Sequence, residues 1–165
     1  KEARGIVNVE FVEGNARHLP FEDRSFDLVY CFSSLYHIPK VDEVIAEIAR
    51  VLRPSGVCIL EMGNRWSLNT LVCNASPELA TPCHHSVPEM RRMIRSAGLV
   101  VRRHRAFQIL PYWGTRPRWL GLFLRGFWKR MLQRRVCGRM LDEWISNLPG
   151  FRSLAFRHFF VCQQI

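Results

Sequence analysis

Hydrophobic and polar positions along the chain form short blocks that have the length of β-strands. The block from Asn8 to Glu13 alternates, while the block from Phe26 to Phe32 is almost continuously apolar. Alternation is typical of a half-buried strand, and a short apolar run rich in β-branched and aromatic residues is typical of a buried parallel strand. These patterns predict five strands, at residues 8–13, 26–32, 57–62, 99–105 and 156–163.

Three segments between these strands have helical spacing. Residues 39–52 place apolar side chains on one face, acidic residues near the start and Arg50 near the end, which suits the helix dipole. Residues 86–98 begin with Ser86 as an N-cap and end at Ala97-Gly98. Residues 119–144 are helical by pattern. Strands that alternate with helices predict a three-layer α/β domain with a largely parallel sheet.

The composition fits one folded domain, and its net charge is strongly positive. The 165 residues are 48% hydrophobic, enough for a core, and no apolar stretch approaches the ~20 residues that a spanning helix needs. The six cysteines include no Cys-x-x-Cys pair, so we interpret them as buried reduced thiols of a cytosolic protein. The net charge is +10, and no acidic residue stands between Arg91 and Arg139. That bias favours an anionic partner.

Four motifs follow one another in residues 9–62. They are Val9-Glu-Phe-Val-Glu-Gly-Asn15-Ala16-Arg-His-Leu19-Pro20-Phe21, Ser25-Phe26-Asp27-Leu-Val-Tyr, Leu35-Tyr-His37-Ile38 and Glu47-Ile-Ala-Arg50-Val-Leu-Arg53-Pro54-Ser-Gly56. In this order and spacing they resemble the class I S-adenosylmethionine-dependent methyltransferases, in the type 11 group that includes quinone-biosynthesis enzymes. The resemblance implies a Rossmann-like three-layer sandwich with an antiparallel last strand and S-adenosylmethionine as the cofactor. Beyond residue 62 the resemblance is limited to the kind of elements, a helix that ends in Ala97-Gly98 and a last strand.

The resemblance also implies where the cofactor binds. It assigns the adenine amino group to the side chain of Asn15 and an adenine ring nitrogen to the N–H of Ala16, since an amide offers an acceptor without a charge. The alternative for Asn15 is an Asx-turn residue. The methionine portion is implied to lie against Cys31, Phe32 and Ser33, at the carboxyl edge where open α/β sheets bind ligands. An ordinary core position is the alternative for Phe32.

His37 is the one candidate catalytic residue. Near a methyl donor it could accept a proton from an oxygen or nitrogen nucleophile, because histidine titrates near neutral pH. We favour the alternative, a residue at a helix start that supports the pocket wall. Direct displacement at a sulfonium methyl depends on alignment and needs no metal. The segment Cys83-His84-His85 cannot readily close a tetrahedral site alone, so no metal ligand is predicted.

The segment that would hold most of the cofactor is missing from this sequence. The family begins with a strand, a Gly-rich turn and a helix, and no Gly-x-Gly-x-x-Gly-like segment occurs here. The family's sheet order is 3-2-1-4-5-7-6, so we expect a domain truncated before its third strand. Strands four to seven should form a contiguous sheet, while the strand at 8–13 loses its neighbour and leaves strand four as an open edge. The chain alone is therefore expected to be inactive and poorly stable.

A basic and aromatic insert, at about residues 108–150, separates the last two strands. On a helical projection, Leu120, Phe123, Leu124, Phe127 and Met131 fall on one side, and Arg118, Arg125, Lys129 and Gln133 lie opposite. This pattern suits an interfacial helix on anionic lipid, so Arg118, Arg125 and Lys129 are candidates for peripheral membrane contact. By resemblance the insert covers the acceptor site, which favours an apolar acceptor. The alternative is a helix packed on the sheet with a solvated basic face, and two glycines weaken a continuous helix.

The sequence thus predicts methyl transfer from S-adenosylmethionine to a small, apolar acceptor, by a longer protein of which this chain is a part. One alternative is a non-catalytic basic module that docks on an anionic membrane or partner through residues 116–139. Another is an RNA methyltransferase, supported by charge alone. Nucleic acid is disfavoured because base-stacking aromatics should stand among the basic residues, whereas here they follow the apolar side. The expected location is cytoplasmic, with peripheral membrane contact as an option.

Overall fold

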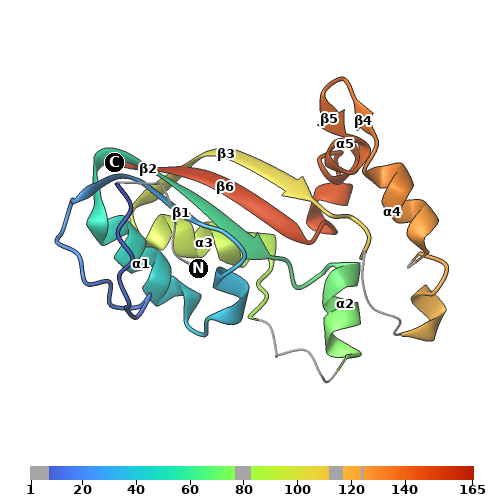
Figure 1. Ribbon diagram of the computed structural model, residues 1–165, viewed down its shortest axis with the longest axis horizontal. Helices are drawn as coiled ribbons and strands as arrows, with labels where there is room; N and C mark the ends of the chain where they lie inside the picture. The colour runs from blue at the N-terminus through green and yellow to red at the C-terminus, as the bar shows by residue number, and fades with distance from the viewer. Residues whose placement is uncertain (1–7, 77–82, 112–116, 124) are drawn as a thin grey trace.

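The computed structural model describes residues 8–76, 83–111, 117–123 and 125–165. Its main sheet contains β1 (Phe26–Cys31), β2 (Leu52–Gly63), β3 (Leu99–Phe107) and β6 (Arg157–Gln164), in the order β1-β2-β6-β3. Strands β1 and β2 are parallel, and β6 is antiparallel to both β2 and β3. The α/β fold, the order of the last four strands and the antiparallel last strand are confirmed (Figure 1).

Helices α1 (Val41–Val51) and α3 (Val87–Ser96) cover one face of this sheet (Figure 1). Their apolar positions build a core with residues from all four strands, and Ile45, Ile94 and Phe160 are completely buried. The start of α3 is a capping box, in which Ser86 Oγ accepts from the Glu89 N–H and the Glu89 carboxylate accepts from the Ser86 N–H. Both helices therefore begin and end close to the predicted residues.

Shorter elements complete the described chain. They are η1 (Leu35–His37), α2 (Leu68–Asn74), η2 (Arg118–Leu120), α4 (Gly126–Leu132), β4 (Arg135–Val136), β5 (Arg139–Met140), α5 (Leu141–Ser146) and η3 (Phe151–Ser153). Helix α5 and the hairpin β4–β5 lie on the side of the sheet opposite α1 and α3, next to the end of β3 (Figure 1). Asp142 holds α5 there by accepting from the N–H groups of Gln108 and Ile109, at 2.5 and 3.0 Å.

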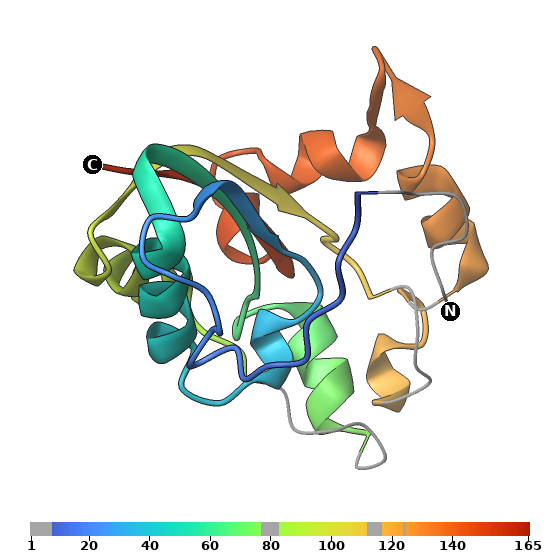
Figure 2. The same cartoon turned by 60° about the vertical axis from the view of Figure 1, so that its left-hand side comes forward.

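Residues 8–13 do not form the predicted strand. They contain no strand residue and are exposed, and Phe11 is 77% exposed. Figure 2 shows this segment, in dark blue, as an extended coil. A strand needs hydrogen-bonded neighbours, and in the described part of the chain β1 is the outermost strand on its side of the sheet. Without a paired strand beside them in the described part of the chain, residues 8–13 are extended but do not form a strand.

The prediction that residues 119–144 are helical is correct only for parts of this segment. Within the described residues this segment divides into η2, a turn, α4, the hairpin β4–β5 and α5. The predicted apolar side divides as well, because Leu120 is buried whereas Phe123 and Phe127 are exposed; Leu124 lies outside the described residues. Glycines within the segment favour these breaks, since glycine is a poor helix former.

All six cysteines are free thiols. Cys58 and Cys162 are buried directly opposite each other on β2 and β6, whereas Cys137 is exposed at the hairpin. The prediction of buried thiols is therefore confirmed for these two strand positions and wrong for Cys137.

The face of the sheet opposite α1 and α3 is largely open. Strand register places side chains in rows across this face, because partners in a ladder point to the same side. The rows are Tyr30-Ile59-Val161-Arg103 and, toward the carboxyl ends of β1, β2 and β3, Glu61-Phe159-Arg105. This face therefore combines apolar side chains from the central strands with arginines from β3.

Candidate functional site

The turn after β1 is held by a carboxylate on the neighbouring strand. Beyond Cys31, Ser33 adopts a left-handed backbone with a φ of 53°. Its N–H donates to Oε2 of Glu61 at 3.0 Å, and its hydroxyl lies 3.5 Å from the same oxygen. A left-handed backbone costs energy for a residue with a side chain. The contact with Glu61 therefore stabilises this turn at the carboxyl edge of the sheet.

Glu61 itself is a buried carboxylate with one oxygen facing an arginine. The residue is only 2% exposed, and its Oε1 lies 3.2 Å from Nε of Arg157, at the start of β6. Neither Oε1 nor Nε has a hydrogen bond of good geometry to any described residue. Because a buried charge is tolerated only when it is paired, Arg157 compensates Glu61. Ser33, Glu61 and Arg157 thus form a polar chain across β1, β2 and β6.

Sequence reasoning missed both Glu61 and Arg157. The available signal was weak: Glu61 is the single acidic residue in the apolar block 57–62, and Arg157 interrupts the apolar block 156–163. A charged residue in a buried strand usually has a partner. The expected sheet order places β2 beside β6, but no local pattern gives the register that brings Glu61 close to Arg157.

The structure brings Cys31, Phe32 and Ser33 together at the carboxyl edge, as the resemblance implied. Phe32 is 45% exposed, and its ring lies 5.3 Å from that of Tyr30 and 5.8 Å from that of Phe159. The alternative that Phe32 is an ordinary core residue is therefore wrong. Cys31 packs against the core, and burial raises the pKa of its thiol. The edge thus offers an accessible aromatic ring and a fixed backbone turn.

Asn15 and Ala16 lie in the loop that precedes β1, and side chains of α1 hold this loop. The Leu19 N–H donates to a carboxylate oxygen of Glu47 at 2.9 Å, and Arg50 donates to the Leu19 carbonyl at 3.1 Å. The hydrogen bond to Arg50 is the main cause of a lowered pKa of Glu47. The loop therefore depends on charged groups of α1 for its position.

Asn15 forms the Asx turn that was its alternative role. Its Oδ1 accepts from the Arg17 N–H at 3.0 Å. An amide oxygen has two lone pairs, so this turn and an adenine contact are compatible, and the adenine role stays a prediction. Ala16 packs against the same apolar cluster as Cys31. The two implied cofactor segments therefore share one supporting core.

His37 lies exposed at the end of η1. Its ring is 4.6 Å from that of Tyr36, and its backbone N–H donates to the Ser34 carbonyl at 2.9 Å. Tyr36 is buried and packs edge-on near His84. This placement is compatible both with support of a pocket wall and with proton acceptance, so the catalytic role of His37 stays a prediction.

His84, which the sequence analysis considered only as part of the segment Cys83-His84-His85, is a buried histidine. The hydroxyl of Thr70 donates to the Asn64 carbonyl at 2.7 Å, and Nδ1 of His84 lies 2.7 Å from the same hydroxyl oxygen. Since the hydroxyl has only one hydrogen, Nδ1 of His84 is the donor in this contact. Burial lowers the pKa of His84 to about 4, so the ring is neutral near pH 7.

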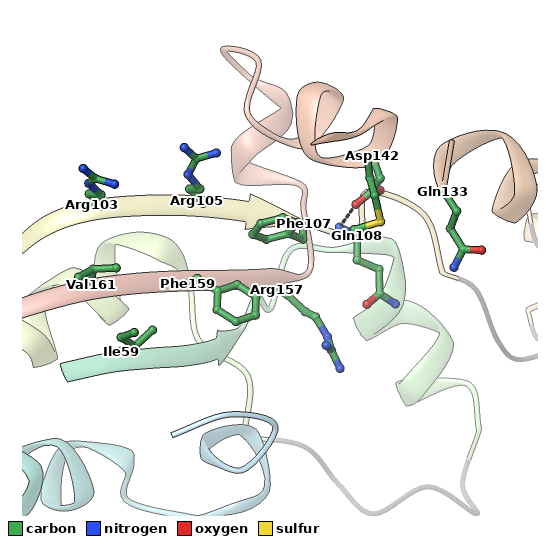
Figure 3. Close-up of a pocket in the computed structure, with 11 residues that line it drawn as sticks. Ile59, Arg103, Arg105, Phe107, Gln108, Gln133, Asp142, Arg157, Phe159 and Val161 are labelled. Carbon is green, nitrogen blue, oxygen red and sulfur yellow. Dashed lines mark hydrogen bonds between the residues drawn. The ribbon is translucent and has the colours of Figure 1, made fainter. Parts of the chain in front are cut away.

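A cleft of about 700 Å³ lies on the open face of the sheet (Figure 3). Its residues come from β2, β3 and β6 and from the insert, and they are Ile59, Arg103, Arg105, Phe107, Gln108, Gln133, Met140, Asp142, Arg157, Phe159 and Val161. Figure 3 shows Arg157 extending from the start of β6 at one end, with Arg103 and Arg105 spaced along β3. The cleft therefore connects the insert with the carboxyl edge of the sheet.

Two further observations concern ions and membranes. Among the described residues, no group of three or more His, Cys, Asp and Glu side chains has the arrangement of a metal site. None of the helices in that part combines the length and the apolar character that crossing a bilayer requires.

Comparison with known proteins shows that this chain is similar to methyltransferases. Residues 1–60 match the family model described as a methyltransferase domain. The chain is 32% identical over 147 residues to a fatty-acid O-methyltransferase of Mycolicibacterium smegmatis, a match that covers 89% of this chain and 44% of that protein. It is 44% identical over 54 residues to a ubiquinone/menaquinone biosynthesis C-methyltransferase of Brucella canis, with coverages of 32% and 20%. The chain thus spans less than half the length of these curated relatives.

The fold also has solved counterparts. A S-adenosylmethionine-dependent methyltransferase of Thermotoga maritima matches with a TM-score of 0.57 and 16% identity, over 93% of this chain and 63% of that one. At this identity the likeness concerns the fold. The family match contains Asn15, Ala16, His37 and the turn at Cys31–Ser33, whereas Arg157 and the insert lie outside it.

Proposed function

We propose that this chain, which belongs to the class I S-adenosylmethionine-dependent methyltransferases, is part of a longer enzyme that methylates a small apolar acceptor. The observation that carries the proposal is the sheet order β1-β2-β6-β3 together with the family match over residues 1–60. In open α/β sheets, ligands bind outside the carboxyl ends of the strands. At that edge of this sheet, the Ser33–Glu61–Arg157 chain meets the cleft.

The chain has residues for two parts of the cofactor. Asn15 and Ala16 would hold the adenine, and the segment from Cys31 to Ser33 would contact the methionine portion through an accessible ring and a fixed turn. The bound cofactor would supply an electrophilic methyl group. The role of the chain is to position the acceptor and to exclude water with the rings of Phe32 and Phe159. His37 keeps its two candidate roles, support of the pocket wall and proton acceptance.

An apolar acceptor is supported by the lining of the cleft. Ile59, Phe159 and Val161 form a continuous apolar surface there, and Phe107 packs edge-on against Phe159 with ring centroids 5.2 Å apart. By their names, one curated relative is a fatty-acid O-methyltransferase and the other is a C-methyltransferase of ubiquinone/menaquinone biosynthesis. Both observations support an acceptor with a large hydrocarbon or ring portion.

Calorimetric titration of S-adenosylhomocysteine tests the proposed function. We expect binding by the longer protein that includes the upstream segment and no measurable binding by residues 1–165, because most cofactor contacts are assigned to that segment. In the longer protein, Phe32→Ala should weaken binding about tenfold, since a stacked aromatic ring contributes roughly 1 kcal/mol or more. Phe127→Ala, an exposed aromatic position on α4 that lies outside the family match, is the matched control. Tight binding by residues 1–165 alone would show that the cofactor residues in this chain are sufficient, and it would contradict the expectation that the upstream segment is needed. The absence of binding by both proteins would favour a non-catalytic module.

A second candidate function, docking on an anionic membrane, is favoured by the surface of the insert. Trp119, Leu122 and Phe127 are exposed beside the exposed basic residues Arg118, Arg125 and Lys129. Apolar side chains among basic ones suit the headgroup region of an anionic bilayer. The same exposure removes one argument against nucleic acid, because the aromatic rings here are accessible. We favour the membrane, because aliphatic Leu122 has no base-stacking role.

Vesicle cosedimentation tests this surface. The double variant Arg125→Glu/Lys129→Glu should lose at least about tenfold in its partition to phosphatidylserine vesicles, since each basic residue contributes about 1 kcal/mol near an anionic surface. Arg92→Glu/Arg95→Glu makes the same change in charge on exposed positions of α3, and it should retain most binding. Equal losses in both variants would indicate a net-charge effect and count against a docking surface on the insert.

A further inference from the structure

We propose that Arg157 binds the carboxylate of an amphipathic organic acid whose hydrocarbon part lies on the apolar floor of the cleft. The inference deepens the proposed function and rests on it, because it names the chemical class of the acceptor. It depends on three observations: the apolar floor, the distribution of charge around it, and the position of Arg157 beside the turn at Ser33.

The floor of the cleft accommodates a hydrocarbon chain. Ile59 and Val161 are register partners on β2 and β6, and Phe159 follows them toward the carboxyl edge, where its ring contacts Phe107 and Phe32. These side chains form one apolar strip across the open face. A bound hydrocarbon would remove this strip from water, at roughly 25 cal/mol for each Å² buried.

Charge around the cleft leaves a cationic group for an anion. Asp142 is already used, because its two oxygens accept from the backbone N–H groups of Gln108 and Ile109. Glu143 pairs with Arg105. Among the described residues, the one acidic side chain that pairs with Arg157 is Glu61, which directs a single oxygen, Oε1, toward Nε. The acidic residues of the described cleft therefore leave N–H donors of its arginines without an anionic partner.

Arg157 has donors that suit a carboxylate. A guanidinium has five N–H groups in a planar fork, and its two terminal nitrogens can hold both oxygens of one carboxylate. In the described part of the chain these terminal nitrogens make no hydrogen bond within range, and the side chain is 37% exposed. The carboxylate of Glu61, 3.2 Å from Nε, would repel a dianion more than a monoanion. The site therefore favours a carboxylate over a phosphate monoester.

The position of Arg157 places such an acid next to the expected methyl donor. Arg157 contacts Glu61, and Glu61 holds the N–H of Ser33, in the segment assigned to the methionine portion of the cofactor. A carboxylate oxygen is already deprotonated near pH 7, so an acceptor of this class needs no general base.

Calorimetry with decanoate and decan-1-ol, which differ in the charged head, tests this assignment on the 165-residue chain. We expect decanoate to bind at least about tenfold more tightly at pH 8, because a charge-assisted pair is worth roughly 1.5–3 kcal/mol, and 1.4 kcal/mol is a factor of ten. Arg157→Gln should abolish this preference and leave decan-1-ol binding within about twofold. Arg102→Gln, an exposed position of β3 whose side chain bonds Gln163, should change neither.

A second variant protects the test against misfolding. Arg157→Gln leaves the Glu61 carboxylate buried without a partner, whereas Glu61→Gln/Arg157→Gln removes both charges together. The double variant should bind both probes with similar affinity. Equal binding of the two probes by the unmodified chain, or a preference for decanoate that survives in the double variant, would overturn the assignment. If the longer protein binds S-adenosylhomocysteine while the acid preference is absent, this inference alone fails and the proposed function stands.

Discussion

Glu61→Ala is expected to lower the free energy of unfolding by about 3 kcal/mol. The substitution removes the acceptor of the Ser33 N–H at 3.0 Å and the charge that compensates Arg157 at 3.2 Å. Loss of one partner of a buried pair costs about 3–5 kcal/mol when the other charge stays buried. Arg157 is partly exposed and can regain water, so we expect the lower end of that range. Urea denaturation followed by circular dichroism measures the change.

Two variants isolate the cause of this loss. Glu61→Gln keeps an acceptor for the Ser33 N–H but removes the charge, so it should cost less than Glu61→Ala. Glu22→Ala changes an exposed glutamate and should stay within about 0.5 kcal/mol of the unmodified chain. If Glu61→Ala costs no more than Glu22→Ala, the carboxylate does not stabilise the turn after β1.

Local patterns were sufficient to locate the four strands of the main sheet and the helices that cover it. The periodicity of residues 39–52 and the cap at Ser86 depend on neighbouring residues, so the sequence located α1 and α3 within a few positions. The order β1-β2-β6-β3 came from the family resemblance, because no local pattern states which strands pair. The same resemblance located Cys31, Phe32 and Ser33 correctly at the carboxyl edge, although their role in cofactor binding stays a prediction.

Features that depend on long-range partners escaped prediction. The alternating block 8–13 has the composition of a strand, but its backbone lacks a neighbour to bond in the described part of the chain. The contact of Glu61 with Arg157 joins residues that are distant along the chain but diagonal across β2 and β6. In the insert, the helical projection assumed a continuous helix, so it could not show that Leu120 is buried and Phe127 exposed. Burial in this protein is decided by tertiary contacts that the projection omits.

Acidification from pH 7 to pH 5 is expected to lower the free energy of unfolding by roughly 3 kcal/mol, because three histidines are neutral in the fold. Arg91 donates to Nδ1 of His104, so the other nitrogen of His104 donates to Nδ1 of His158, whose Nε2 donates to the Ala155 carbonyl. Burial lowers the pKa of His104 to about 3 and that of His158 to about 4, and the pKa of His84 is also about 4. Protonation of either His104 or His158 would remove an acceptor from this relay.

The direction follows from proton binding. An unfolded histidine titrates near pH 6.5, so between about pH 6.5 and pH 4 the unfolded chain binds protons that the folded chain does not. The stabilisation is therefore complete above about pH 6.5 and is lost as the pH falls. Each shift alone corresponds to about 2 kcal/mol between pH 7 and pH 5, and we halve the sum because His104 is partly exposed and interacts with His158. The lowered pKa values of Glu47 and Glu89 act only at lower pH.

Urea denaturation at pH 7, 6 and 5 measures this dependence, with variants that separate the relay from other groups. His104→Gln keeps a polar side chain that does not titrate, so it should lower the stability at pH 7 while reducing the loss between pH 7 and pH 5 by about a third. His18→Gln changes an exposed histidine in the loop before β1 and should leave the slope unaltered. A pH slope that is identical in His104→Gln and in the unmodified chain would show that His104 binds its proton equally in the folded and unfolded states. In that case the hydrogen bonds from Arg91 to His104 and from His104 to His158 would not keep the ring neutral.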